Sequence, residues 1–178
     1  LEQKYGPAAV YRGGLMVRTS LDIQAQQAAE EIVKRRIEQL APYHVNNGAL
    51  VAMLPWSGEI IAMVGSADFY NDAIDGQYNV AIAERQPGSA IKPVTYLTAF
   101  EKAGWYPGTI VFDYAKVWNI PGFGRYAPRN ATGQHFGAIT VREALANSLN
   151  IPALQAIEVV GVPAMIDMAH RLGIKTGF

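Results

Sequence analysis

Two β-rich runs separated by a turn-forming tetrapeptide most constrain what this chain can fold into. The runs are Ala49 to Leu54 and Glu59 to Val64, and Pro55-Trp56-Ser57-Gly58 lies between them. Pro and Gly favour a tight reversal, so the two runs are predicted to pair as a β-hairpin. Because helical patterns stand on both sides of this hairpin, the order of elements predicts an α+β fold.

The segment before the hairpin predicts a short strand and then a helix. Gly13-Gly14 opens a β-like run, Leu15 to Thr19, after which Ser20 or Asp22 could cap a helix. Pro42 fits the end of that helix. Its apolar positions recur at helical spacing: Ile23, Ala29, Ile32, Val33, Ile37 and Leu40.

Beyond the hairpin, Pro87-Gly88 marks a turn directly before Ser89. The residues from Ser89 to Lys102 predict a helix with Pro93 in its first turn, and Gly104 would end it. Residues 105–137 carry many Gly, Pro, Asn and aromatic residues, which predicts a long irregular surface segment.

The remainder of the chain carries three helix starts. Thr140 followed three residues later by Glu143 is a capping-box pattern. Pro152 and Pro163 are each typical of the first turn of a helix, and Gly173 fits the end of the second one. These segments predict a helical cluster over residues 89–178.

Charge and composition exclude several classes of function. Fifteen basic and fifteen acidic residues cancel and alternate locally, so no basic face for nucleic acid is expected. The absence of cysteine excludes disulfides and thiolate chemistry. The longest apolar run, Gly48 to Leu54, is far shorter than the ~20 residues of a membrane-spanning helix.

Histidine and aspartate residues predict no further chemistry. His44, His135 and His170 are scattered without helical pairing, so neither a metal nor another cofactor is expected. Three aspartates lie in loop-like sequence without a convincing partner, which favours solvated turn positions: Asp68, Asp72 and Asp113.

Ser89 and Lys92 are the first candidates for catalysis. Three residues apart on a helix, they share a face, and a partly neutral lysine amine could take the serine proton. Apolar neighbours of Lys92 would lower its pKa, and the backbone N–H of Ser89 at a helix start could stabilise an oxyanion. A helix-capping serine followed by a surface lysine is the alternative.

The string Arg85-Gln86-Pro87-Gly88-Ser89-Ala90-Ile91-Lys92-Pro93 resembles the active-serine segment of penicillin-binding proteins, and most closely that of the bifunctional class A branch. The family also carries a Ser-x-Asn motif, and Ser148-Leu149-Asn150 follows in the expected order. The resemblance implies that Ser148 relays a proton to the leaving group. It also implies that Asn150 holds a substrate carbonyl or the Lys92 amine. A helix end with Asn as its cap is the alternative.

Lys175-Thr176-Gly177 matches the family's third motif in letters but follows Asn150 after only a short helix. We interpret this match as coincidental. The resemblance then covers the N-terminal part of the transpeptidase domain, and the chain is expected to be truncated, with low activity in this form. Residues 1–12 are expected to be an interdomain connection, and residues 13–178 a partial transpeptidase domain in which residues 13–65 supply strand, helix and hairpin.

The resemblance implies a D,D-transpeptidase of peptidoglycan that works through a Ser89 acyl-enzyme. Its partners would be stem peptides ending in D-Ala-D-Ala and β-lactam antibiotics, and the protein would act outside the cytoplasm. In the family, a glycosyltransferase domain and a membrane anchor lie upstream. A serine β-lactamase or β-lactam sensor is one alternative reading, and a non-catalytic structural or binding fragment is another.

Overall fold

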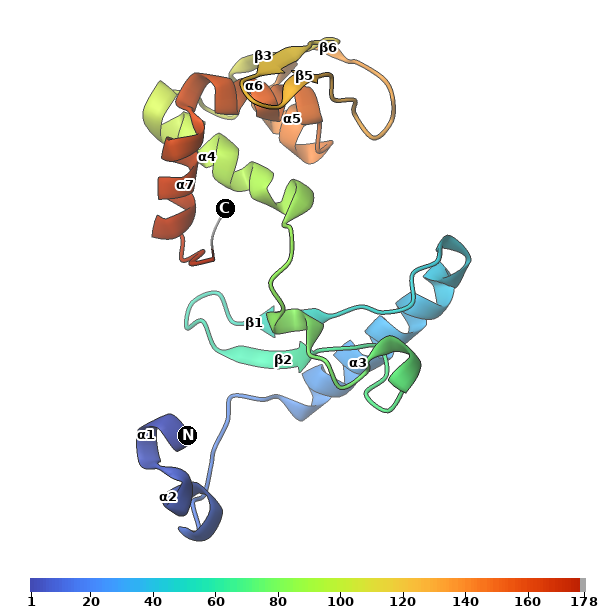
Figure 1. The fold of residues 1–178 in the computed structure, drawn as a ribbon, viewed down its shortest axis with the longest axis vertical. Coiled ribbons are helices and arrows are strands. Elements are labelled where there is room, and N and C mark those ends of the chain that lie inside the picture. Colours follow the sequence, from blue (N-terminus) through green and yellow to red (C-terminus); the bar gives the residue numbers. More distant parts are fainter. Residues whose placement is uncertain (177–178) are drawn as a thin grey trace. The chain divides into compact units, whose positions relative to one another are not determined.

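The computed structural model describes residues 1–176, which form two compact units. The first unit is Leu1–Glu84, and the second begins at Arg85. The first unit contains three α-helices, two strands and three short 3-10 helices (Figure 1): α1 (Glu2–Tyr5), α2 (Pro7–Arg12), α3 (Ile23–Leu40), η1 (Ala41–Tyr43), β1 (Leu50–Met53), β2 (Ile60–Val64), η2 (Asp72–Ile74) and η3 (Val80–Ile82).

The predicted hairpin is confirmed. β1 and β2 pair antiparallel, with Leu50 opposite Val64 and Ala52 opposite Ala62. The register shifts between Ala52 and Met53, next to the turn. α3 packs on this hairpin through Ala29 and Val33, which are buried together with alternate residues of β2 and so form a small apolar core.

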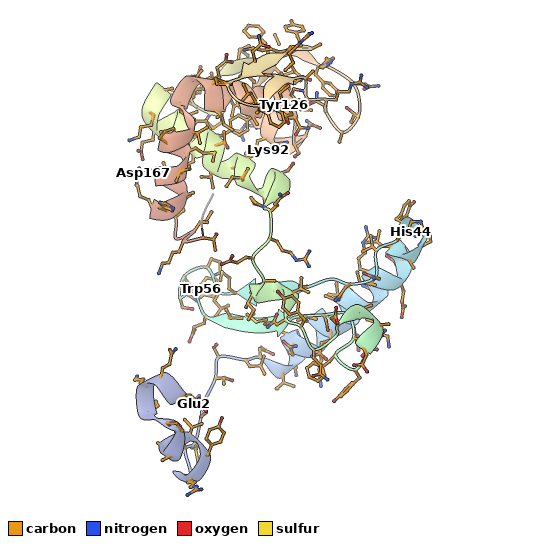
Figure 2. The ribbon with its side chains drawn as sticks, viewed as in Figure 1. Glu2, His44, Trp56, Lys92, Tyr126 and Asp167 are labelled. Carbon is orange, nitrogen blue, oxygen red and sulfur yellow. The ribbon has the colours of Figure 1, made fainter. Side chains whose placement is uncertain are left out.

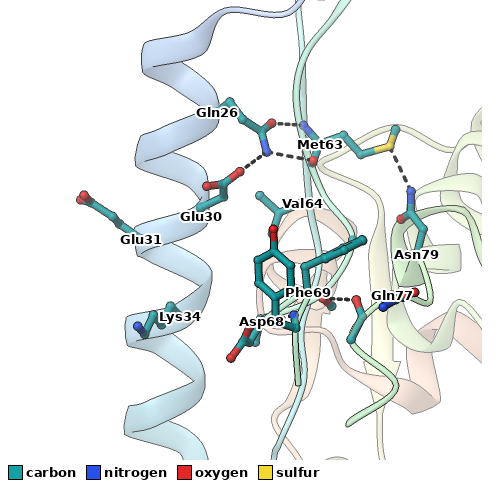
Figure 3. Close-up of a pocket in the computed structure, with 15 residues that line it drawn as sticks. Gln26, Glu30, Glu31, Lys34, Met63, Val64, Asp68, Phe69, Gln77 and Asn79 are labelled. Atoms are coloured by element: carbon teal, nitrogen blue, oxygen red, sulfur yellow. Dashed lines mark hydrogen bonds between the residues drawn. The ribbon is translucent and has the colours of Figure 1, made fainter. Parts of the chain in front are cut away.

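The start of α3 also covers the outer edge of β2. Of the two predicted caps, Asp22 is the one used: its carboxylate accepts hydrogen bonds from the backbone N–H groups of Gln24 and Ala25, at 2.9 and 3.0 Å. Four residues later, the Gln26 amide bonds both backbone groups of Met63, as Figure 3 shows. The Gln26 side chain therefore satisfies both backbone groups of Met63 at the edge of β2.

The predicted strand at Leu15 to Thr19 is wrong. These residues form no strand, and Met16 is fully exposed. The segment reaches β2 only just after the expected strand, where Ser20 Oγ and the Asp22 N–H donate to the carbonyl oxygens of Ile60 and Ile61. Two bonds at one point are too few for a ladder, so β-propensity alone does not make a strand here.

Within residues 85–176, the second unit combines four α-helices with two small two-stranded sheets and one 3-10 helix: η4 (Gly88–Ile91), α4 (Lys92–Ala103), β3 (Ile110–Asp113), β4 (Trp118–Ile120), β5 (Gly124–Tyr126), β6 (Gly137–Thr140), α5 (Val141–Ala146), α6 (Asn150–Val160) and α7 (Val162–Arg171). β3 pairs with β6, and β4 pairs with β5, both antiparallel. With the hairpin of the first unit, this content confirms the α+β prediction.

α4 is the central helix of the second unit. One buried cluster joins Tyr96 and Ala99 of α4 to small residues of α5 and α6 and to Val111 of β3. A second cluster joins Val94 of α4 to α7. Thr98 is buried within this helix, and its hydroxyl donates to the Val94 carbonyl, so that no polar group is left unpaired at that position.

Two predictions about the second unit need correction. The helix expected from Ser89 begins at Lys92, because residues 88–91 wind as the tighter η4 turn. The segment 105–137, expected to be irregular, contains β3, β4 and β5 and leads into β6. Turn residues separate its short strands, and apolar and polar residues do not alternate clearly along them, so the composition predicted only a loop.

The helix signals of the C-terminal half are confirmed. Thr140 and Glu143 form the complete capping box of α5. Pro152 lies in the first turn of α6, and Pro163 lies at the start of α7. Among residues 1–176, no single helix is long and apolar enough to cross a membrane. α6 and α7 pass that test only as a pair, and they are bent by 96°.

Candidate active site

Ser89 lies in the η4 turn that leads into α4. The turn depends on Gly88, whose φ of 53° is in the left-handed region that glycine adopts without strain. Ser89 is exposed. Within residues 1–176, neither its hydroxyl nor its backbone N–H has a hydrogen-bond partner inside the protein. Both groups are therefore free to meet an incoming acyl group, as expected for a nucleophile and an oxyanion donor.

Lys92 is the first residue of α4, and only 7% of it is exposed (labelled in Figure 2). Its Nζ donates to the Ser148 carbonyl oxygen at 2.5 Å, to Ser148 Oγ at 3.1 Å and to Asn150 Oδ1 at 2.6 Å. Three acceptors match the three hydrogens of the protonated amine. Burial acts against that charge and lowers the pKa of Lys92.

The predicted pair of Ser89 and Lys92 is not hydrogen-bonded. In the described part of the chain, the lysine amine bonds only the Ser-x-Asn motif. Because the two residues are three apart across the junction of η4 and α4, a rotation of the exposed Ser89 side chain is the simplest way to bring its hydroxyl toward the amine.

Ser148 occupies a strained position between two helices. The N–H of Leu149 bonds the Ala144 carbonyl, and the N–H of Ser148 bonds the Leu145 carbonyl, which is the Schellman pattern at the end of α5. Ser148 takes the left-handed residue of that motif, with φ of 51°. Glycine is usual there, so a serine with two contacts to Lys92 suggests that strain is accepted for function.

Asn150 is the first residue of α6. Its side-chain Nδ2 donates to the Arg129 carbonyl oxygen at 2.7 Å, which turns Oδ1 toward Lys92. Its backbone N–H donates to Asn130 Oδ1 at 2.9 Å. The motif forms the corner between two helices, because α5 ends at Ala146 and α6 begins at Asn150.

The interpretation of Asp113 as a solvated turn residue is wrong. Asp113 ends β3 and is fully buried, with both carboxylate oxygens bonded to Asn130 Nδ2 at 3.0 and 2.9 Å. Arg129 and Asn130 were not among the residues predicted from the sequence. No spacing links them to Asn150, since contacts between loop residues and a helix start depend on the folded path of the chain.

The structure describes only Lys175 and Thr176 of the Lys175-Thr176-Gly177 match. Lys175 and Thr176 are exposed, and no hydrogen bond joins them to Lys92, Ser148 or Asn150 among the residues that the structure describes. Gly177 lies outside the described residues. The interpretation of this match as coincidental stays a prediction.

A separate groove of about 670 Å³ lies in the first unit, between α3 and the residues that follow β2 (Figure 3). Its lining includes Glu30, Lys34 and Tyr70. None of the four predicted catalytic residues lines it. Among residues 1–176, no group of three or more His, Asp or Glu side chains is arranged to hold a metal ion.

Comparisons of the sequence with known proteins all point to one family. The family model described as "Penicillin binding protein transpeptidase domain" matches residues 48–177. Penicillin-binding protein 1A of Rickettsia typhi is 35% identical over 130 residues, 72% of this chain and 16% of that protein. Penicillin-binding protein 1B of Vibrio cholerae is 33% identical over 178 residues, 98% of this chain and 22% of that protein.

The solved structures agree with the sequence comparisons. PonA1 of Mycobacterium tuberculosis is similar with a TM-score of 0.74 and 26% identity, over 99% of this chain and 43% of that one. Its complex with penicillin V is similar with a TM-score of 0.71 and 27% identity, over 96% of this chain and 42% of that one. The chain thus spans less than half the length of each of these relatives.

Proposed function

The chain belongs to the penicillin-binding protein transpeptidase family, in its class A branch. We therefore propose that it is part of a D,D-transpeptidase of peptidoglycan, with Ser89 as the nucleophile. The substrate would be a stem peptide ending in D-Ala-D-Ala. Ser89 Oγ would attack the carbonyl of the penultimate D-Ala, release the terminal D-Ala and form an ester. An amine of a second stem peptide would then take the acyl group and free Ser89.

The observation that carries the proposal is the triple hydrogen bond of Lys92. It brings the Ser-x-x-Lys motif to the Ser-x-Asn motif across 56 to 58 residues of chain. The alternative of a surface lysine behind a capping serine does not explain why the amine is buried. A buried amine bonded to a hydroxyl that can itself donate suits a group that must exchange a proton.

In this reaction Lys92 acts as the general base. Its lowered pKa raises the neutral fraction that can accept the Ser89 proton. Ser148 Oγ, at 3.1 Å from Nζ, would pass a proton onward to the departing D-Ala amine. Asn150 holds the other side of the lysine amine, so that Nζ stays beside the Ser148 hydroxyl while the Ser89 side chain rotates toward it.

β-Lactams are the proposed inhibitors, since a strained lactam carbonyl presents Ser89 with an acyl group that resembles the D-Ala-D-Ala end. The similar PonA1 structure was solved with penicillin V. A peptidoglycan substrate places the proposed activity outside the cytoplasm. We further propose that residues 1–12 connect to a neighbouring domain and that residues 13–178 are part of the transpeptidase domain.

Labelling with a fluorescent penicillin tests the function. Wild-type intact protein is expected to form a covalent adduct on the peptide that contains Ser89, seen by mass spectrometry, and Ser89→Ala is expected to form none. Ala90→Ser, a neighbour that keeps the nucleophile, is the control and should still label. An adduct that persists in Ser89→Ala would overturn the proposal.

The same assay separates transpeptidase from β-lactamase. A transpeptidase adduct is expected to persist because water is not activated against the ester, whereas a β-lactamase turns over and releases hydrolysed penicillin. Rapid loss of label with accumulation of hydrolysed penicillin would favour the β-lactamase reading instead.

A further inference from the structure

Behind Lys92 lies a chain of hydrogen bonds that ends on a buried carboxylate. Asp113 bonds Asn130 Nδ2, Asn130 Oδ1 accepts from the Asn150 N–H, and Asn150 Oδ1 accepts from Lys92 Nζ. Asp113 is 0% exposed and Asn130 is 4% exposed. Both therefore act on the site without access to solvent or to a substrate.

The carboxylate of Asp113 decides which way the Asn130 amide faces. An ionised carboxylate only accepts hydrogen bonds, and Asp113 already accepts one from the Phe136 N–H at 2.9 Å. The Asn130 Nδ2 must therefore face Asp113, and its second hydrogen goes to the Gln134 carbonyl at 2.8 Å. Only Oδ1 remains, and it points to the start of α6.

That oxygen caps α6 from outside the helix. The residue before the helix is Leu149, whose side chain has no acceptor, so the first N–H groups of α6 lack a local cap. Asn130 Oδ1 takes the N–H of Asn150, and the neighbouring Arg129 carbonyl takes the Asn150 side-chain Nδ2. Two adjacent loop residues thus accept hydrogen bonds from the main chain and the side chain of one helix residue.

A second contact keeps β3 and α6 together. The Gln155 amide bonds both backbone groups of Phe112, with Nε2 to the carbonyl oxygen at 2.6 Å and the N–H to Oε1 at 3.3 Å. Phe112 precedes Asp113, and Gln155 is little more than one turn beyond Asn150. The strand that carries the carboxylate is therefore held to the helix that carries the Ser-x-Asn amide.

From this geometry we propose that Asp113 and Asn130 are positioning residues for acylation: they fix the orientation of the Asn150 amide and, through it, the place of the Lys92 amine. The inference rests on the proposed function, because acylation of Ser89 is its readout. Neither residue touches the reacting atoms. Their effect is expected in the rate of the chemical step and not in the initial binding of penicillin.

Asn130→Ala in the intact protein is the first test, with Thr132→Ala as the matched control. Thr132 lies on the same loop, and among residues 1–176 its hydroxyl takes part in one hydrogen bond, accepted from the Gln134 N–H. The concentration dependence of labelling gives the acylation rate constant and the dissociation constant of fluorescent penicillin. Thermal unfolding of each variant is measured separately to show that it is folded. Asn130→Ala is expected to lower the rate constant about tenfold or more with binding within about twofold, because a misplaced base costs rate and not affinity. Thr132→Ala should match wild type.

A double variant that exchanges the two side chains, Asp113→Asn with Asn130→Asp, provides a test if Asn130→Ala fails to fold. Asn130→Asp alone sets two carboxylates together, and Asp113→Asn alone replaces one of the two acceptor oxygens that orient Asn130 with a donor NH2 group. The double variant restores an amide facing a carboxylate, and the carboxylate now at position 130 can still accept from the Asn150 N–H. We expect the double variant to acylate faster than the Asn130→Asp variant.

The outcomes separate the two proposals. A wild-type acylation rate in folded Asn130→Ala would overturn the positioning role and leave the proposed function intact. If Asn130→Ala does not fold, a double variant no faster than Asn130→Asp overturns it equally. Wild-type protein that is never acylated at Ser89 would overturn the proposed function and this inference with it.

Discussion

The carbonyl oxygen of Ser148 accepts a 2.5 Å hydrogen bond from the Nζ of Lys92, and Ser148 adopts left-handed backbone to do so, with φ of 51°. A right-handed residue there would continue α5 and turn that carbonyl along the helix axis. The bond therefore joins the end of α5 to Lys92, the general base of the proposed reaction. It also separates two roles of Ser148, one of its backbone and one of its hydroxyl.

Replacing Ser148 tests the two roles. Ser148→Gly keeps the backbone bond and removes the left-handed strain, whereas Ser148→Ala keeps the strain. The glycine variant is expected to be more stable than the alanine variant by about 1 kcal/mol in urea unfolding. Both lose the hydroxyl, so both should lose transpeptidation to a similar degree. An alanine variant as stable as the glycine variant would contradict the strain.

Lys92→Met tests the base. Methionine fills a similar buried volume without the amine, so the fold should persist. Because a positioned general base typically contributes about 10² to 10⁴ in rate, acylation by penicillin should fall by about that factor. Lys102→Met, on the exposed end of the same helix, is the control and should acylate normally. Equal acylation rates in Lys92→Met and Lys102→Met would show that Lys92 is not the general base.

The lowered pKa of Lys92 also predicts a pH dependence of stability. Between the lowered pKa and the ordinary 10.5, the unfolded lysine binds more protons than the folded one. The cost of burying the charge is thus fully present below the folded pKa and is relieved as pH rises through that window. Stability of wild type relative to Lys92→Met should rise over this range in urea titrations. A difference in unfolding free energy between wild type and Lys92→Met that stays constant with pH would contradict the lowered pKa of Lys92.

Tyr96→Phe tests a buried hydroxyl. Tyr96 is 1% exposed, and its OH has no hydrogen-bond partner among the described residues. Burial, and then the negative charge of Asp113, raise its pKa and keep it protonated. Removing an unpaired buried hydroxyl is expected to stabilise the fold by up to about 1 kcal/mol. Tyr106→Phe, an exposed control, should change little, and a clearly destabilised Tyr96→Phe would indicate a partner for the hydroxyl.

The ion pair of Glu101 and Arg171 joins α4 to α7 with two bonds of 2.8 Å. Arg171, and secondarily Lys102, lower the pKa of Glu101 to about 2. The stability from this pair is present above pH 4.5 and is lost as pH falls from 4.5 toward 2. Arg171→Ala should raise the Glu101 pKa in a carboxyl NMR titration, and Lys102→Ala should raise it less. The reverse order would contradict the assignment.

Local signals account for what could be predicted. The hairpin around Pro55-Trp56-Ser57-Gly58, the Asp22 cap and the Thr140 capping box depend on residues a few positions apart, and all three are present in the structure. Leu15 to Thr19 failed because a strand also needs a partner along its length, which local propensity does not supply.

The α+β plan and the candidate pair Ser89 and Lys92 followed from motif spacing and helix periodicity, which are properties of neighbouring residues. The family and the candidates Ser148 and Asn150 followed from the resemblance of two sequence motifs to those of a known family. The folded chain was needed to show that Lys92 bonds Ser148 and Asn150, and that Asp113 is buried behind them. These contacts join residues up to 58 positions apart. Burial and hydrogen-bond partners arise when helices and loops pack, and a carboxylate in loop-like sequence carries no local mark of that environment.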